Sequence, residues 1–191
     1  MKKFIIILLS AVGFVTVLTG CRNDVPIREK FDEIKTTDFL PYYGTYTYIR
    51  DWQTVLMEYH NCIFYINHGV NKISDIKRMY SYEDDIITLS MTEYSHIQQL
   101  LDTFDKLSIT YLGVDVVGNV HIILYWNDQC KYYFLRVQPG CTLEEVKDHF
   151  GEKDKEYGLY EGNWYMRQEN HEQDKPEDLS APGMRDWFLG K

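Results

Sequence analysis

The first 20 residues of this chain constrain its fold most, because they have the composition of an export signal rather than of a globular core. Lys2 and Lys3 precede an uncharged, mostly apolar run from Phe4 to Gly20. Positive charge, an apolar segment and small residues before a processing point form a secretory signal, which is excluded from fold reasoning. The run is also shorter than the roughly 20 residues that span a bilayer comfortably. We therefore expect the 171 residues from Cys21 onward to form the folded protein.

The end of this segment carries a more specific pattern. Leu18, Thr19, Gly20 and Cys21 resemble the lipobox of bacterial lipoproteins. The resemblance implies that a diacylglyceryl group is attached to the sulfur of Cys21, that the chain is cleaved before it, and that the new amine is usually acylated. Two or three acyl chains exceed the two signals that stable anchoring needs. The alternatives are a retained anchor or an ordinary cleaved signal, with Cys21 incidental in both.

The same resemblance implies a place in the cell envelope. In Gram-negative members, residues directly after the cysteine influence sorting, and Arg22 is not the aspartate associated with inner-membrane retention. We therefore expect the periplasmic face of the outer membrane, with a Gram-positive or other outer surface as the alternative. The likeness is confined to the leader, and the sequence that follows is assigned to no family.

The chain after the leader has the length of one domain and an acidic composition. Without Lys2 and Lys3, 18 basic residues face 29 acidic ones, a net charge of -11. This excess argues against nucleic acid, which binds through basic patches. It suits either solubility or a basic partner. The expected parts are a signal peptide (1–20), a lipidated N-terminus with a short helix or linker (21–40), a globular domain (41–168) and a polar tail (169–191).

Hydrophobic periodicity predicts an α+β domain. Strands are expected at residues 42–49, 55–66, 86–91, 109–117, 120–126, 132–137 and 162–167, while residues 72–82 fit either a strand or a helix. Helices are expected at 25–35, after a capping box of Ser95 and Gln98, and after a second box of Thr142 and Glu145. Gly118 and Asn119 favour a hairpin turn, so the adjoining strands would form a meander. The prediction is a single antiparallel sheet with a β-meander, packed by one or two amphipathic helices.

Three cysteines follow Cys21, and an exported compartment permits a disulfide between them. Cys130 and Cys141 flank an expected strand at 131–138. At roughly 3.3 Å per residue, this strand holds the two apart by more than the roughly 7 Å that a disulfide allows between Cα atoms. Pairing would therefore join Cys62 to one of them, or no pair forms.

No motif predicts a catalytic residue, a metal site or a cofactor. Patterns for a serine hydrolase, a zinc protease, a P-loop and a dinucleotide site are absent. His60 and Cys62, at i and i+2 of the expected strand 55–66, are the best available base and nucleophile. A core cysteine beside a partly exposed histidine is, however, far commoner than a catalytic pair. His60 and His68 would lie too far apart along one strand to share an ion.

Two acidic pairs have structural explanations. Asp84 with Asp85 fits a solvated loop, and Glu144 with Glu145 fits the first turn of a helix, where negative charge is favourable. Neither pair predicts paired catalytic carboxylates.

Aromatic residues on the expected strands carry the functional prediction. Tyrosine supplies a large contact area and keeps a hydroxyl for a partner. The candidate partner surface comprises Tyr46, Tyr48, Trp126, Trp164 and, in the tail, Trp187. A sheet with core aromatics and ordinary β-forming tyrosines explains the same pattern.

We expect a membrane-anchored, non-enzymatic module that binds a protein partner, with a toxin-neutralising immunity protein as one concrete version. An envelope-assembly or structural accessory lipoprotein is the alternative. An enzyme with an unrecognised site is the second alternative.

Overall fold

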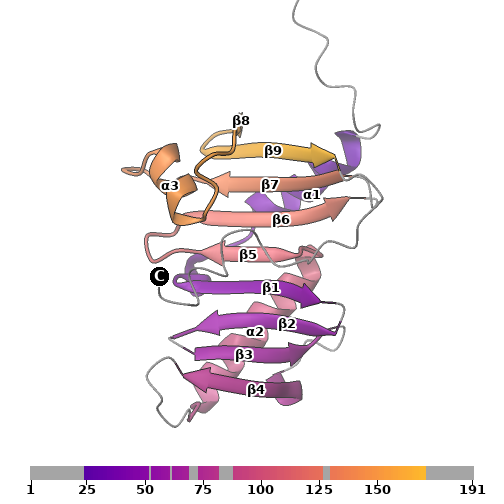
Figure 1. Ribbon diagram of the computed structural model, residues 1–191, viewed down its shortest axis with the longest axis vertical. Coiled ribbons are helices and arrows are strands. Elements are labelled where there is room, and N and C mark those ends of the chain that lie inside the picture. The colour runs from indigo at the N-terminus through magenta and orange to yellow at the C-terminus, as the bar shows by residue number, and fades with distance from the viewer. Residues whose placement is uncertain are drawn as a thin grey trace, which may run out of the picture.

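The computed structural model describes residues 24–51, 53–60, 62–68, 73–81, 88–126 and 130–170, which form a sheet packed by helices (Figure 1). The strands are β1 (Thr45–Asp51), β2 (Thr54–Tyr59), β3 (Cys62–Asn67), β4 (Ile76–Ser81), β5 (Tyr111–Val114), β6 (Val120–Trp126), β7 (Cys130–Arg136), β8 (Gly158–Glu161) and β9 (Trp164–Asn170). The α-helices are α1 (Asp24–Lys35), α2 (Met91–Leu107) and α3 (Leu143–His149), with 3₁₀ turns at Leu40–Tyr42 and Ile73–Asp75.

The nine strands form one sheet in the order β4-β3-β2-β1-β5-β6-β7-β9-β8. Every neighbouring pair is antiparallel. The expected α+β class, the antiparallel sheet and the β5-β6-β7 meander are therefore confirmed. Residues 72–82, which fitted either a strand or a helix, contain strand β4.

Two halves of the sheet meet at one short seam between β1 and β5. Thr45 to Tyr48 pair with Val114 to Tyr111, and the Ile49 amide donates to the Thr110 carbonyl at 2.9 Å. The chain leaves the first half at β4, on one edge, and returns to the centre through α2. Helix α2 therefore connects the two halves.

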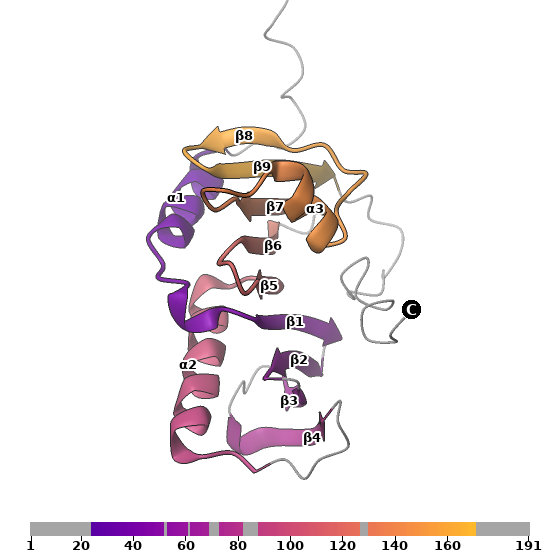
Figure 2. The same ribbon diagram turned by 90° about the vertical axis from the view of Figure 1, so that its left-hand side faces the viewer.

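Helices α1 and α2 pack on the same side of the sheet and bury the main core (Figure 2). The predicted apolar side of α2 is confirmed, because its buried residues are Ile97, Leu100, Leu101, Phe104 and Leu107. In α1, Phe31 is fully buried and lies 5.2 Å from the ring centre of Phe134 in β7. Full burial of one such side chain contributes about 1.5–3 kcal/mol. Helix α1 is thus part of the globular unit.

Helix α3 lies on the opposite side of the sheet from α1 and α2 (Figure 2). Val146 and Phe150 pack there with Leu135 and Val137 at the end of β7. The predicted capping box is confirmed, since the Thr142 hydroxyl accepts from the Glu145 amide and the Glu145 carboxylate accepts from the Thr142 amide. Among the described residues, no helix covers β1 to β4 on this side.

The expected single strand at 55–66 is wrong. The chain turns at His60, whose φ of +46° is rare outside glycine, and forms the β2-β3 hairpin. The apolar run continues through the hairpin because both strands contribute to the core, so periodicity alone hides the turn. Tyr59 pairs with Cys62, and His60 therefore does not share a strand face with Cys62.

The predicted start of α2 is also wrong. Its capping box is Ser90 with Glu93 rather than Ser95 with Gln98: the Ser90 hydroxyl accepts from the Glu93 amide at 3.3 Å, and the Glu93 carboxylate accepts from the Ser90 amide at 2.7 Å. Met91, expected at the end of a strand, is the first residue of α2. Glu93 brings a negative charge to the helix N-terminus, which Gln98 cannot.

The expected two-residue turn at Gly118 and Asn119 is a longer loop. Strand β5 ends at Val114 because the Asp115 carboxylate accepts bonds from the Val117 and Asn119 amides at 2.9 and 2.8 Å. Gly118 does adopt the positive φ that the prediction required. Strand β8 was not predicted, and β9 continues to Asn170.

The cysteines follow the geometric expectation in part. Cys62 and Cys141 each carry a thiol, so Cys130 and Cys141 are not joined to each other. Cys130 is disulfide-bonded, and neither of these two is its partner. In the part of the chain that the structure describes, no helix is both long and apolar enough to span a membrane.

The reassigned cap gives a direct test. Ser90→Ala removes the hydroxyl that accepts from the Glu93 amide and should lower the free energy of unfolding by about 1 kcal/mol. Ser95→Ala, at an exposed position inside α2, should change it by less than about 0.5 kcal/mol. Urea unfolding followed by circular dichroism measures both. A larger loss from Ser95→Ala than from Ser90→Ala would show that Ser95, and not Ser90, caps the helix.

Candidate functional site

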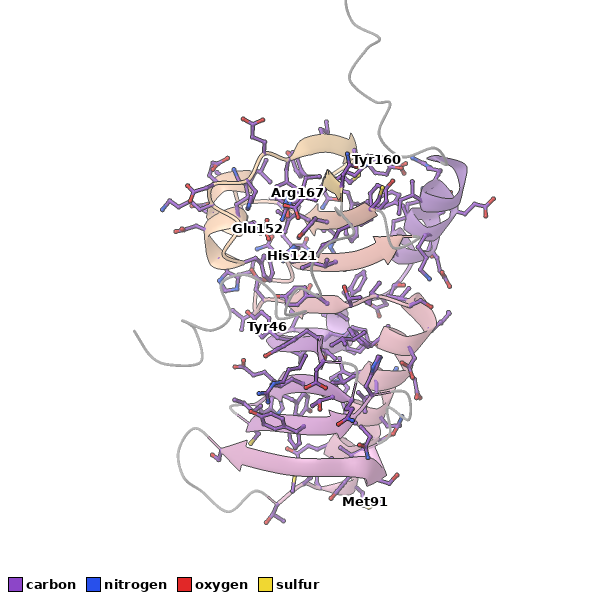
Figure 3. The ribbon with its side chains drawn as sticks, turned by 45° about the vertical axis from the view of Figure 1, so that its right-hand side comes forward. Tyr46, Met91, His121, Glu152, Tyr160 and Arg167 are labelled. Atoms are coloured by element: carbon purple, nitrogen blue, oxygen red, sulfur yellow. The ribbon has the colours of Figure 1, made fainter. Side chains whose placement is uncertain are left out.

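The antiparallel register places two rows of side chains on the side of the sheet opposite α1 and α2. The first row is Ile63, Glu58, Tyr46, Gly113, His121, Leu135 and Tyr165, and the second is Tyr65, Leu56, Tyr48, Tyr111, Ile123, Tyr133 and Arg167. We call these two rows the tyrosine face. Figure 3 shows Tyr46, His121 and Arg167 along it, with Glu152 nearby. Residues from β3 to β9 thus share one surface.

Glu58 and Tyr46 are direct cross-strand neighbours on the tyrosine face. Burial raises the pKa of the half-buried Glu58 carboxyl. Burial first, and the charge of Glu58 second, raise the pKa of the Tyr46 phenol. Among the described residues, no hydrogen bond or ion pair reaches the Glu58 carboxylate. A half-buried carboxylate without a counter-charge is a binding feature for a cation.

Gly113, which has no side chain, lies between Tyr46 and His121 on the tyrosine face. A Cβ atom there would lie 2.5 Å from the Tyr111 hydroxyl and 3.0 Å from the Phe150 ring. The Tyr111 side chain therefore occupies the space above Gly113, and the ring of Phe150, the residue that follows α3, also contacts this space. Burial raises the pKa of this phenol well above its usual value.

His121 is buried among aromatic rings. Its ring centre lies 4.9 Å from that of Tyr111, 5.3 Å from that of Phe150 and 6.2 Å from that of Tyr133. Neither of its nitrogens has a hydrogen-bond partner among the described residues. Burial, with Arg167 and Lys131 adding to it, lowers the pKa of His121 to about 3. The imidazole is therefore neutral near pH 7.

A buried ion pair fixes the segment after α3 onto the face. The Arg167 Nε donates to the Glu152 carboxylate at 2.9 Å, and the Tyr157 hydroxyl donates to the same oxygen at 3.2 Å. Burial raises the pKa of Glu152 against the opposing charge of Arg167. The Arg167 guanidinium also lies 3.2 Å from the ring centre of Tyr133. Removing one partner of such a pair leaves a buried charge, so this cluster is structural.

The tyrosine face already holds cations of its own chain on aromatic rings. Arg50 lies 5.5 Å from the ring centre of Tyr65, and Lys131 lies 5.2 Å from that of Tyr133. Both distances are within the range of cation–π attraction. The chemistry of the face therefore favours guanidinium and ammonium groups.

The predicted partner residues are not all on one surface. Tyr46 and Tyr48 lie on the tyrosine face, but Tyr48 is only 6% exposed. Trp164 is 5% exposed and packs in the main core against Phe31 on the other side of the sheet. Neither buried side chain is accessible to a partner in this structure, because strand position alone does not tell which face is covered. Trp126 is the last residue of β6.

The other candidates fall in different places. Leu18, Thr19, Gly20, Cys21, Trp187 and the pair Asp84 and Asp85 lie outside the described residues. Glu144 and Glu145 lie in the first turn of α3, as predicted.

Glu58, His121 and Arg167 were missed as site residues. Glu58 could have been found from the sequence, since it is the one charged residue between Val55 and Tyr59 and lies two residues from Leu56, on the same face of the strand. His121 and Arg167 gave none, because only the sheet order brings them together. Within the described ranges, no three ligating side chains gather as a metal site.

No family model, no curated protein and no solved structure matches this chain. Function is therefore inferred from the chemistry of the site rather than from a fold relative.

His121 predicts a pH dependence of stability. The unfolded histidine takes a proton below its usual pKa near 6.5, whereas the folded one takes it only below about 3. Acidification between these values therefore favours the unfolded state, at up to about 1.4 kcal/mol per pH unit. His121→Phe should remove this contribution, so that stability falls less steeply from pH 6 to pH 4. His60→Gln, at a side chain 65% exposed, is the matched control. Parallel pH profiles for wild type and His121→Phe would contradict the assignment.

Gly113 predicts a steric cost on substitution. Gly113→Ala places a methyl group against Tyr111 and Phe150 and should destabilise the fold by about 1–3 kcal/mol. The control is Gly158→Ala in β8, where a Cβ would meet nothing closer than 3.9 Å. Adding Tyr111→Phe should recover part of the loss, because the nearest atom is the hydroxyl. Equal stabilities of the two alanine variants in thermal unfolding would refute the close contact.

Proposed function

We propose that this chain is a lipid-anchored protein of the bacterial cell envelope that binds a basic protein partner and carries out no catalysis. The observation that supports this best is Glu58, a half-buried carboxylate beside Tyr46 on the part of the tyrosine face that no described helix covers. A lysine or arginine of a partner would supply the counter-charge that Glu58 lacks among the described residues.

Charge and chemistry agree with a basic partner. Without Lys2 and Lys3 of the leader, the formal net charge is -11, from 18 basic and 29 acidic residues, so the protein attracts a basic protein at long range. At short range, Tyr46 would offer its ring to the same cation that pairs with Glu58, as Tyr65 does for Arg50. Long-range attraction and local recognition would thus act on one partner.

The mechanism would be occlusion. The lipid on Cys21, which the resemblance of Leu18 to Cys21 to a lipobox supports, would concentrate the domain at the membrane. The half-buried residues Ile63, Glu58 and Tyr46 of the tyrosine face would then contact the working surface of the partner, since Leu56 and Tyr48 in the row beside them are only 4% and 6% exposed. A toxin-neutralising immunity protein is the concrete version, and an envelope-assembly factor differs from it only in the identity of the partner.

The anchor has its own test. Wild-type protein isolated from its native membrane should carry the mass of a diacylglyceryl group on Cys21, and Cys21→Ser should leave the membrane fraction or stay unprocessed with an unchanged fold. Cys62 and Cys141 carry thiols, so a disulfide of Cys130 within the chain would need the sulfur of Cys21, which a thioether excludes. A disulfide between Cys21 and Cys130, found by peptide mapping without reduction, would therefore overturn the anchor. Acylated membrane attachment that persists in Cys21→Ser would overturn the assignment.

Partner binding tests the carboxylate. The partner is first captured by mild crosslinking of the detergent-solubilised native lipoprotein and identified by mass spectrometry. Glu58→Gln should then weaken its binding by 2 kcal/mol or more, roughly 30-fold, because a desolvated charge pair loses one member. Glu156→Gln changes the net charge equally at an exposed site outside the face and should alter only the salt dependence. Equal effects of the two variants on the dissociation constant would remove Glu58 from the interface.

A further inference from the structure

The connection between the anchor and the domain is short. Only two residues, Arg22 and Asn23, separate Cys21 from Asp24, the first residue of α1, so the chain takes three residue steps between them. At no more than about 3.6 Å per residue, the start of α1 lies within about 11 Å of the lipid attachment point. The start of α1 therefore stays close to the bilayer surface.

Helix α1 is fixed to one end of the sheet. Phe31 is fully buried and contacts Tyr160 of β8 at 4.7 Å and Trp164 of β9 at 5.6 Å between ring centres. Lys35 donates to the Glu161 carboxylate of β8 at 2.8 Å, and Arg28 donates to the same carboxylate. These contacts hold α1 at the β8-β9 edge, far from β4 (Figures 1 and 2).

The β8-β9 edge suits a lipid surface in spite of the acidic sequence. Glu161 is the only acidic residue of β8, and its partners Arg28 and Lys35 also pair with Asp32 of α1, so two cations balance two carboxylates there. Leu159 is 67% exposed on the same strand. A neutralised edge with an exposed apolar side chain is not repelled by anionic headgroups, and the apolar side chain gains from contact with the interface.

We propose that the domain stands edge-on to the bilayer, with β8 at the lipid headgroups and β4 at the far end. This orientation rests on the proposed lipid anchor. Eight strand spacings of about 4.8 Å place β4 roughly 38 Å from β8. Met91, at the start of α2, marks the far end and Tyr160 the near one (Figure 3).

In this orientation, membrane anchoring and partner binding take place at different ends of the sheet. Glu58 on β2 is six strands from β8, or roughly 29 Å at about 4.8 Å per strand. This exceeds the Debye length of about 8–10 Å, so an anionic membrane surface does not compete with Glu58 for a basic partner. The half of the tyrosine face under α3 is closer to the membrane, and the half with Tyr46 and Glu58 is presented away from it.

Fluorescence quenching tests the orientation. A fluorescent amino acid is introduced at Leu159, at Met91 or at Lys106 on the exposed side of α2 in the full-length, natively lipidated protein. Each variant is inserted into vesicles of phosphatidylethanolamine and phosphatidylglycerol that contain a lipid with a spin label on its headgroup. The expected result is quenching several-fold stronger at position 159 than at 91 or 106, with all three variants floating with the vesicles.

Two results would overturn the orientation while leaving the anchor intact. Stronger quenching at 91 and 106 than at 159, in protein that floats with the vesicles, would place the helix side against the bilayer. Equal and weak quenching at all three positions would show a domain held away from the surface. Failure of unmodified wild-type protein to float would instead overturn the proposed anchor, and the orientation with it.

Discussion

The pairing of β1 with β5 is the interaction on which the rest of the structure depends. Four residue pairs, Thr45 to Tyr48 with Val114 to Tyr111, join a four-stranded half to a five-stranded half. Without this seam, Glu58 and Tyr46 would belong to a different sheet from His121 and Arg167, and the tyrosine face would not exist. Gly113 lies opposite Tyr46 at the seam and makes room for the Tyr111 side chain. Helix α2 buries its apolar side in the main core, so the covalent connection between the halves is also a packing element.

The two ends of the sheet differ in how their charges are satisfied. Toward β8, Arg167 pairs with Glu152 and Glu161 pairs with two cations of α1. At β2, Glu58 has no such partner among the described residues, and its carboxyl is held at a raised pKa by burial. The charged side chains near the proposed anchor are therefore paired within the domain. In the far half of the tyrosine face, Glu58 is left to pair with a cation from another molecule.

Local patterns predicted the helices better than the sheet. The apolar side of α2 and the capping box of α3 were predicted correctly, because both depend on residues within one or two turns. The start of α2 was not, since the Ser90 and Ser95 boxes satisfy the same rule and only the structure decides between them. The hairpin at His60 was missed because it needs a positive φ at a residue other than glycine. Of the site residues, Tyr46 was named from the sequence and Glu58 could have been. The partners of His121 and Arg167 come from strands far apart in sequence, and burial of Trp164 depends on which side α1 covers.

Site-specific photo-crosslinking in intact cells tests the central claim most directly, with a photoreactive amino acid at Ile63, Leu159 or Lys106. Ile63 adjoins Glu58 on the tyrosine face, Leu159 lies on the β8 edge, and Lys106 lies on the exposed side of α2. The account predicts a discrete protein adduct at Ile63 that Glu58→Lys abolishes, with no protein adduct at Leu159 or Lys106. A protein adduct at Lys106 or Leu159, together with none at Ile63, would show that the partner binds elsewhere and would contradict the assignment of the tyrosine face.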